Sequence, residues 1–78
     1  MADNGGHPDI ERTRAALFEV LLSKVKEDPF PSSTTMDLIE EMLTPEELPA
    51  YAGALMEKIA DEAFPSVTMM KRLQSLVT

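Results

Sequence analysis

Apolar side chains recur along most of the chain at the three- and four-residue spacing of amphipathic helices. The first such segment spans 10–27 and ends before Pro29, because a proline disfavours helical geometry at the residue that precedes it. Asp9 is a suitable N-cap for this helix. The segment before it, 1–8, is rich in glycine and small polar residues and is expected to form a flexible tail. The apolar face comprises Ile10, Leu17, Phe18, Leu21, Leu22 and Val25.

A clear helix-start signal at 44–47 separates the next two predicted helices. The second helix is expected over about 33–43, where the hydroxyl residues 32–35 offer several ways to cap it. Segment 44–47 then combines an N-cap threonine, a proline at the first helical position and a glutamate that can bond back to the cap amide. Pro49 cannot donate the next helical hydrogen bond, so this first turn is either a separate short element or the site of a kink.

The third helical pattern continues to Ala63, and a fourth begins after a second corner at 64–66. Gly53 interrupts the third pattern at a cost of up to about 1 kcal/mol relative to alanine. Two interpretations of this glycine are open: it permits a neighbouring helix to approach closely, or it has no structural role. The apolar face of the fourth helix comprises Val67, Met69, Met70, Leu73, Leu76 and Val77.

The sequence resembles itself at a shift of 34 residues, so 11–44 and 45–78 are interpreted as two copies of one helix–corner–helix unit. A single helical hairpin has one apolar side that it cannot bury alone. We therefore predict an all-α fold in which two tandem helical hairpins pack as one small four-helix domain over 9–78. The period equals that of tetratricopeptide repeats, whose Trp, Leu-Gly and Tyr pattern neither copy carries. Matched apolar pairs are Leu21/Leu55, Val25/Ile59, Ile39/Leu73 and Met42/Leu76.

Both copies contain the same Phe-Pro-Ser corner between their helices. We expect Phe30 and Phe64 to fill these corners by packing against Met36 and Met70, respectively. Each of these methionines lies about one helical turn into the helix that follows its corner.

Charge limits the classes of partner that the chain can bind. Fourteen acidic residues against seven basic ones give a net charge of −7, which repels phosphate backbones and anionic membranes. No cysteine is present, so disulfides and thiolate zinc sites are excluded. No apolar run approaches the roughly 18 residues that span a bilayer, and the first residues lack the pattern of a secretory leader. We therefore expect a soluble cytoplasmic protein that binds neither nucleic acid nor membrane.

Catalytic and metal-binding residue types are scarce. The only histidine is His7, within the expected tail, and there is no cysteine nucleophile. The acidic pairs 27–28 and 61–62 recur at matched positions, but adjacent carboxylates on a helix diverge and no calcium-loop spacing surrounds them. The sequence therefore predicts a protein that is not an enzyme and that needs no cofactor, metal or small-molecule substrate.

The methionine-rich fourth helix suggests a surface that binds a protein partner. Methionine side chains repack around varied partners, and a groove beside this helix would accept an amphipathic helix. The alternative is that these methionines simply fill the core. Our first hypothesis is a small acidic helical interaction module, either a homodimer or an adaptor. Its candidate docking residues are Met69, Met70, Leu73 and Leu76, with Lys71 and Arg72 setting the orientation.

The second and fourth helices differ in charge, since the basic pair of the fourth helix replaces Asp37 and Leu38 of the second. The two helices are either solvated separately or meet through these charges, within one molecule or between two. A second hypothesis is an acidic inhibitor that occupies a basic surface of its partner, such as a DNA-binding surface. Its presenting carboxylates would be Asp37, Glu40, Glu41, Glu46 and Glu47.

Overall fold

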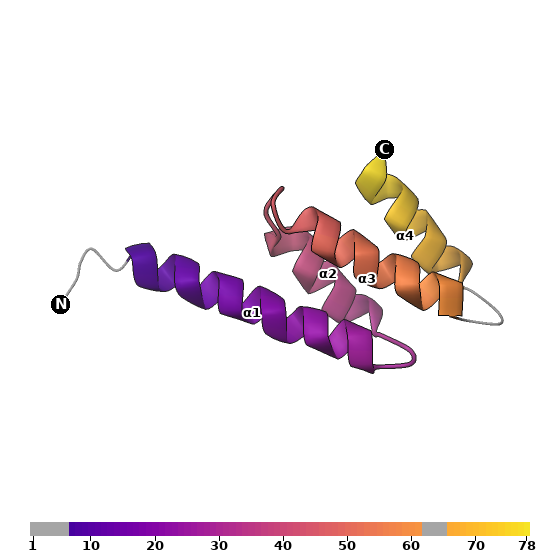
Figure 1. Ribbon diagram of the computed structural model, residues 1–78, viewed down its shortest axis with the longest axis horizontal. Helices are drawn as coiled ribbons and strands as arrows, with labels where there is room; N and C mark the ends of the chain where they lie inside the picture. Colours follow the sequence, from indigo (N-terminus) through magenta and orange to yellow (C-terminus); the bar gives the residue numbers. More distant parts are fainter. Residues whose placement is uncertain (1–6, 62–65) are drawn as a thin grey trace.

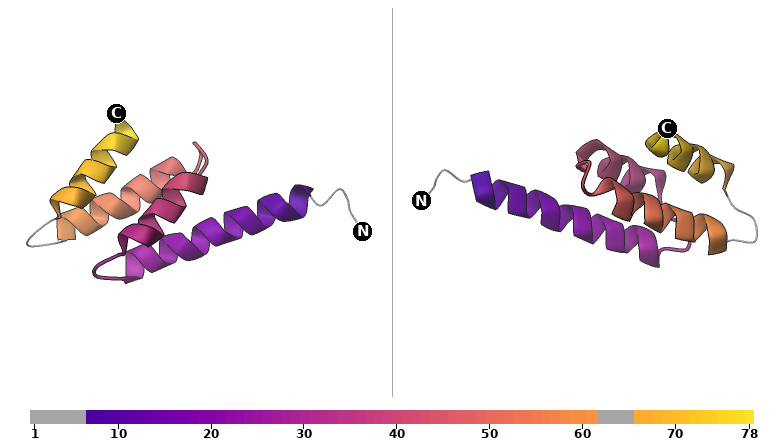
Figure 2. Two further views of the ribbon diagram at one scale, coloured as in Figure 1. Left: turned by 180° about the vertical axis from the view of Figure 1, so that it is seen from behind. Right: turned by 45° about the horizontal axis from the view of Figure 1, so that its top comes forward.

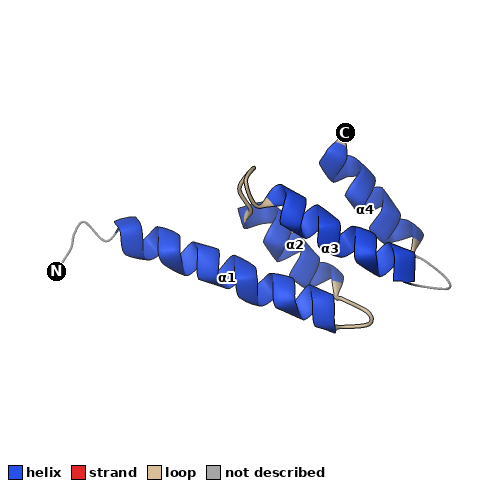
Figure 3. Cartoon of the chain, in the orientation of Figure 1, coloured by secondary structure: helices blue, strands red, loops and turns tan. Residues whose placement is uncertain are grey.

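Four helices form the described part of the chain, residues 7–61 and 66–78, in a computed structural model (Figure 1). No strand occurs in these two segments (Figure 3). Helix α1 packs against α2 and α3, and α3 packs against α4. The predicted all-α fold of two helical hairpins in a small four-helix domain is confirmed, whereas the internal repeat stays a prediction. The helices are α1 (His7–Glu27), α2 (Ser33–Met42), α3 (Leu48–Asp61) and α4 (Val67–Val77).

Helix α1 begins earlier than the sequence predicts. It starts at His7, so the last two residues of the expected tail are helical, and Asp9 lies in the first turn rather than at the N-cap. A carboxylate in the first turn also favours the helix, through the macrodipole. The remainder of the expected tail, 1–6, lies outside the described residues. The N-terminal half of α1 extends beyond the other three helices (Figures 1 and 2), and Ile10 is 68% exposed there.

One hydrophobic core joins the two hairpins. All four helices contribute to it, and the largest completely buried side chains are Tyr51 and Phe18. The hairpins therefore share one interior, as expected if neither can bury its apolar side alone. Among the described helices, none is long and apolar enough to cross a membrane. The buried core residues are Phe18, Leu21, Leu22, Val25, Met36, Ile39, Tyr51, Ala54, Leu55 and Met69.

Serine side chains cap the start of α2 and α4 at positions 34 residues apart. The Ser32 hydroxyl accepts a hydrogen bond from the Thr35 amide at 3.0 Å, and the Ser66 hydroxyl accepts one from the Met69 amide at 3.2 Å. Each bond satisfies one of the backbone donors that a helix start leaves unpaired. The hydroxyl residues of the first corner therefore act partly as caps, as their sequence suggested.

The start of α3 settles the two alternatives that Pro49 left open. Residues 45–47 form a separate turn, and the α-helix begins at Leu48. The Thr44 amide donates to the Glu47 carboxylate at 3.0 Å, which is the predicted bond back to the cap. Because Pro49 has no amide hydrogen to donate, the turn is not continuous with the helix.

One expectation about local packing is wrong, and one of the two interpretations of Gly53 is excluded. Phe30 does not plug its corner: it is 82% exposed, and Met36 is buried without needing its cover. The corner is instead held locally, where the Phe30 amide donates to Asp28 Oδ1 at 2.9 Å. Phe64 lies outside the described residues. Gly53 does not serve close helix approach either, because a Cβ placed on it would meet nothing within 4 Å.

Candidate functional site

An open apolar groove runs along the outer side of the second hairpin, between α3 and α4. It has a volume of about 460 Å³. Met56 on one wall is 58% exposed and Val77 on the other is 63% exposed. An apolar surface that stays in contact with water is a candidate binding face. Within the described segments, its lining residues are all apolar: Ala52, Gly53 and Met56 of α3, and Leu73 and Val77 of α4.

The groove exists because α3 has small residues on its outer side. Its bulky core residues Tyr51 and Leu55 point into the shared interior and are completely buried. The outward positions Ala52 and Gly53 offer almost no side chain to fill the space beside α4. The same lack of side chains would allow the backbone of a docked helix to approach α3 closely.

The four apolar docking residues predicted on α4 occupy different environments. Met69 is buried in the core, at 7% exposed, so it is not accessible to a partner in this conformation. Leu73 and Leu76 are half-buried and pack against the core. Met70 is 38% exposed. Of the four, Leu73 is the residue that also lines the groove.

Arg72 connects α4 to α2 within one molecule, which is one of the alternatives that the charge pattern left open. Its Nη1 atom donates to Asp37 Oδ1 at 2.8 Å and to Glu40 Oε2 at 2.9 Å. The side chain of Arg72 is only 14% exposed, whereas that of Asp37 is 58% exposed. The hydrogen bonds to Glu40 and Asp37 raise the pKa of Arg72. Lys71 and Glu41, which were also predicted to orient or present charge, are exposed.

Tyr51 extends this charged contact into the core. Its hydroxyl donates to Glu40 Oε2 at 2.6 Å, so one carboxylate oxygen receives bonds from both Tyr51 and Arg72. Burial, together with the hydrogen bond to Glu40, raises the pKa of Tyr51 well above its ordinary value of 10.0. Three helices therefore meet at Glu40. Glu40 thus holds these helices together, while Arg72 Nε is buried without a hydrogen-bond partner among the described residues.

A second charged contact, between α1 and the turn before α3, was not predicted. Arg14 donates to both carboxylate oxygens of Glu47 at 2.9 Å, and the hydrogen bond to Arg14 is the main reason that the pKa of Glu47 is lowered. Arg14 also pairs with Glu11 at 2.8 Å. The sequence offered one clue to this contact. Arg14 lies one turn before Phe18, which places it at the edge of the core face of α1.

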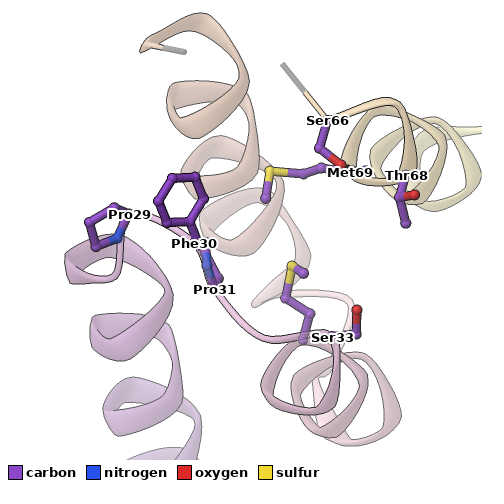
Figure 4. A pocket seen from close by; sticks show the side chains of 8 residues that line it. Pro29, Phe30, Pro31, Ser33, Ser66, Thr68 and Met69 are labelled. Atoms are coloured by element: carbon purple, nitrogen blue, oxygen red, sulfur yellow. Dashed lines mark hydrogen bonds between the residues drawn. The ribbon is translucent and has the colours of Figure 1, made fainter. Parts of the chain in front are cut away.

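A smaller cleft of about 290 Å³ lies between the first corner and the start of α4 (Figure 4). Phe30 and its flanking prolines face Ser66, Thr68 and Met69 across it (Figure 4). The Ser66 hydroxyl already caps α4. The described residues that line this cleft are apolar or carry hydroxyl groups, and none of them is charged.

The described residues contain no group of three or more side chains that could hold a metal ion. Comparison of the chain with protein-family models, with curated proteins and with solved structures finds no match.

Proposed function

We propose that this chain is a small helical protein–protein interaction module, and that it binds a helix of its partner in the groove between α3 and α4. The open apolar lining of this groove carries the proposal, because an amphipathic helix docks by placing its apolar side chains in such a surface. Arg14 binds Glu47 at the start of α3, and Arg72 binds α4 to Glu40 of α2. These contacts hold both walls of the groove in place and so preorganise it. We propose that the module acts in the cytoplasm and is not an enzyme, in keeping with its lack of cysteine.

The proposed site differs from the predicted one mainly in its α3 wall. The sequence pointed to α4 alone, and Leu73 is the residue common to both. The acidic-inhibitor hypothesis receives less support, because Arg72 engages Asp37 and Glu40, and Arg14 engages Glu47. Carboxylates that already bind a guanidinium are poorly placed to imitate a phosphate backbone.

A charge placed in the groove tests this function. Met56→Glu puts a carboxylate on the groove wall, whereas Leu38→Glu is a matched control on α2, where the leucine is 48% exposed and outside the groove. Both variants should keep the helical circular dichroism of the natural protein. In pull-downs from the cells that express the chain, we expect Met56→Glu to lose at least about tenfold of the captured partner and Leu38→Glu to retain it. Equal capture by both variants would contradict the proposed site.

A further inference from the structure

The α3 side of the groove has an acidic rim. Glu57 lies four residues after Gly53, and Asp61 lies four residues after Glu57, so the three positions follow one row along the helix surface. Glu57 and Asp61 are both exposed. A helix lying in the groove would therefore pass two carboxylates about one turn apart.

These two carboxylates have no ion-pair partner among residues 7–61 and 66–78. The cation of α3, Lys58, is directed elsewhere, and its Nζ atom donates to the backbone carbonyl of Asp28 at 2.6 Å. Five carboxylates on other elements pair with the arginines instead. Arg12 pairs with Asp9, Arg14 with Glu11 and Glu47, and Arg72 with Asp37 and Glu40.

The α4 side of the groove supplies no cation to balance this rim. Lys71 and Arg72 line a different depression, which they share with Glu40 of α2. The groove itself is lined on the α4 side by Leu73 and Val77. One rim of the groove is thus negative and its floor is apolar.

Building on the function proposed above, we infer that the occupant of the groove is a basic amphipathic α-helix of a partner protein. Its apolar face fills the space beside Gly53 and Met56, and its lysine or arginine side chains reach Glu57 and Asp61. Charge complementarity favours this occupant over a second copy of the chain, because two molecules of net charge −7 repel each other.

Synthetic helices test the charge of the occupant directly. We would use one peptide of about four turns with leucines at i, i+3, i+4 and i+7 and lysines flanking them, and two control peptides with glutamine or glutamate at the lysine positions. Calorimetric titration should show the tightest binding for the lysine peptide, with weaker binding at high salt. The double variant Glu57→Gln, Asp61→Asn should raise its Kd about two- to tenfold, in the range of exposed charge pairs.

Gly53→Leu provides a variant that blocks the groove without threatening the fold. The position is helical, and the space above it is open, so leucine fits and also favours the helix. We expect this variant to lose binding of the lysine peptide.

The outcomes test two questions separately: which kind of molecule binds in the groove, and whether the groove binds the cellular partner at all. If the glutamine peptide binds as tightly as the lysine peptide, if the double variant leaves Kd unchanged, or if no peptide binds, the basic helix is the wrong occupant. A dimer that Gly53→Leu abolishes would assign the groove to a second copy and also overturn the inference. The function proposed above fails separately, when Gly53→Leu leaves the capture of the cellular partner unchanged.

Discussion

The two hairpins have similar sequences but bury the apolar side chains of their second helices to different extents. In the first, Met36 is 4% exposed and Ile39 is completely buried. Their counterparts 34 residues later are Met70, which is 38% exposed, and Leu73, which is half-buried. The first hairpin hides its second helix in the core, whereas the second hairpin leaves part of its apolar surface open to solvent.

A rotation of α4 about its own axis accounts for the difference. The buried methionine of α4 is Met69, and the residue that matches it in α2 is Thr35, which is only half-buried. Because neighbouring helical positions differ by about 100°, burying Met69 turns Met70 away from the core. The apolar stripe of α4 is thereby divided between the core and the groove. Two similar sequence patterns can therefore specify the same elements without specifying the same burial.

The largest effect on the free energy of unfolding is expected from truncating Ile39 of α2, and its counterpart Leu73 of α4 serves as the comparison. Ile39→Ala should lower the free energy of unfolding by about 2–5 kcal/mol, because it leaves a cavity in the core. Leu73→Ala should cost less than half as much, because its side chain is already partly in solvent. Urea denaturation of the two variants measures both values. Equal losses would show that the two hairpins are buried alike.

Removal of the cation that holds α4 to α2 should have a smaller effect. Arg72→Met is expected to cost about 1–3 kcal/mol, mostly through Glu40, which would remain half-buried without its charged partner. Amide hydrogen exchange should rise in α4 more than in α2. The control Lys71→Met alters an exposed neighbour and should change stability by less than about 0.5 kcal/mol. Similar losses of stability in both variants would contradict the claim that Arg72 holds α4 to α2.

Gly53→Ala should stabilise the protein slightly, by about 0.5–1 kcal/mol, since alanine favours the helix and its Cβ meets open space. The melting temperature should rise accordingly. A fall would mean that another segment packs closely against Gly53 and that the groove is filled.

The contact between Arg14 and Glu47, which joins the first hairpin to the start of the second, predicts a dependence on pH. Folding lowers the pKa of Glu47 below its ordinary value of 4.5, so the contribution is present above that pH and is lost as the pH falls through the folded value. Glu47→Gln should keep the bond from the Thr44 amide but lose the charge. The difference in melting temperature between the natural protein and this variant should shrink between pH 6 and pH 3. A difference that persists at low pH would contradict this.

The sequence was sufficient for the elements and their caps. Proline positions and helical spacing placed all four helices to within a few residues, and the bond from Thr44 to Glu47 followed from residue types alone. These features depend on neighbours along the chain, which a single sequence displays. The same holds for the hairpin architecture, because each helix has one apolar face to bury.

The sequence was not sufficient for features set by the packing of distant segments. The rotation of α4, the exposure of Phe30 and the groove beside Gly53 all depend on how one helix lies against another. The pairing of Arg14 with Glu47 joins residues 33 positions apart, and helical spacing gives no information about such a pair. The candidate site was therefore predicted only in part, through Leu73.

NMR spectra of the methionine methyl groups test most directly whether the open groove is the binding face. The chain has one methionine in this groove and another in the core of the first hairpin, so the two sites can be compared in one spectrum. With methyl-labelled protein and the lysine peptide, the signal of Met56 in the groove should shift on titration, while that of Met36 in the core of the first hairpin should stay in place. A shift confined to Met36, or saturable binding that leaves Met56 unmoved, would contradict the assignment of the open groove as the binding face.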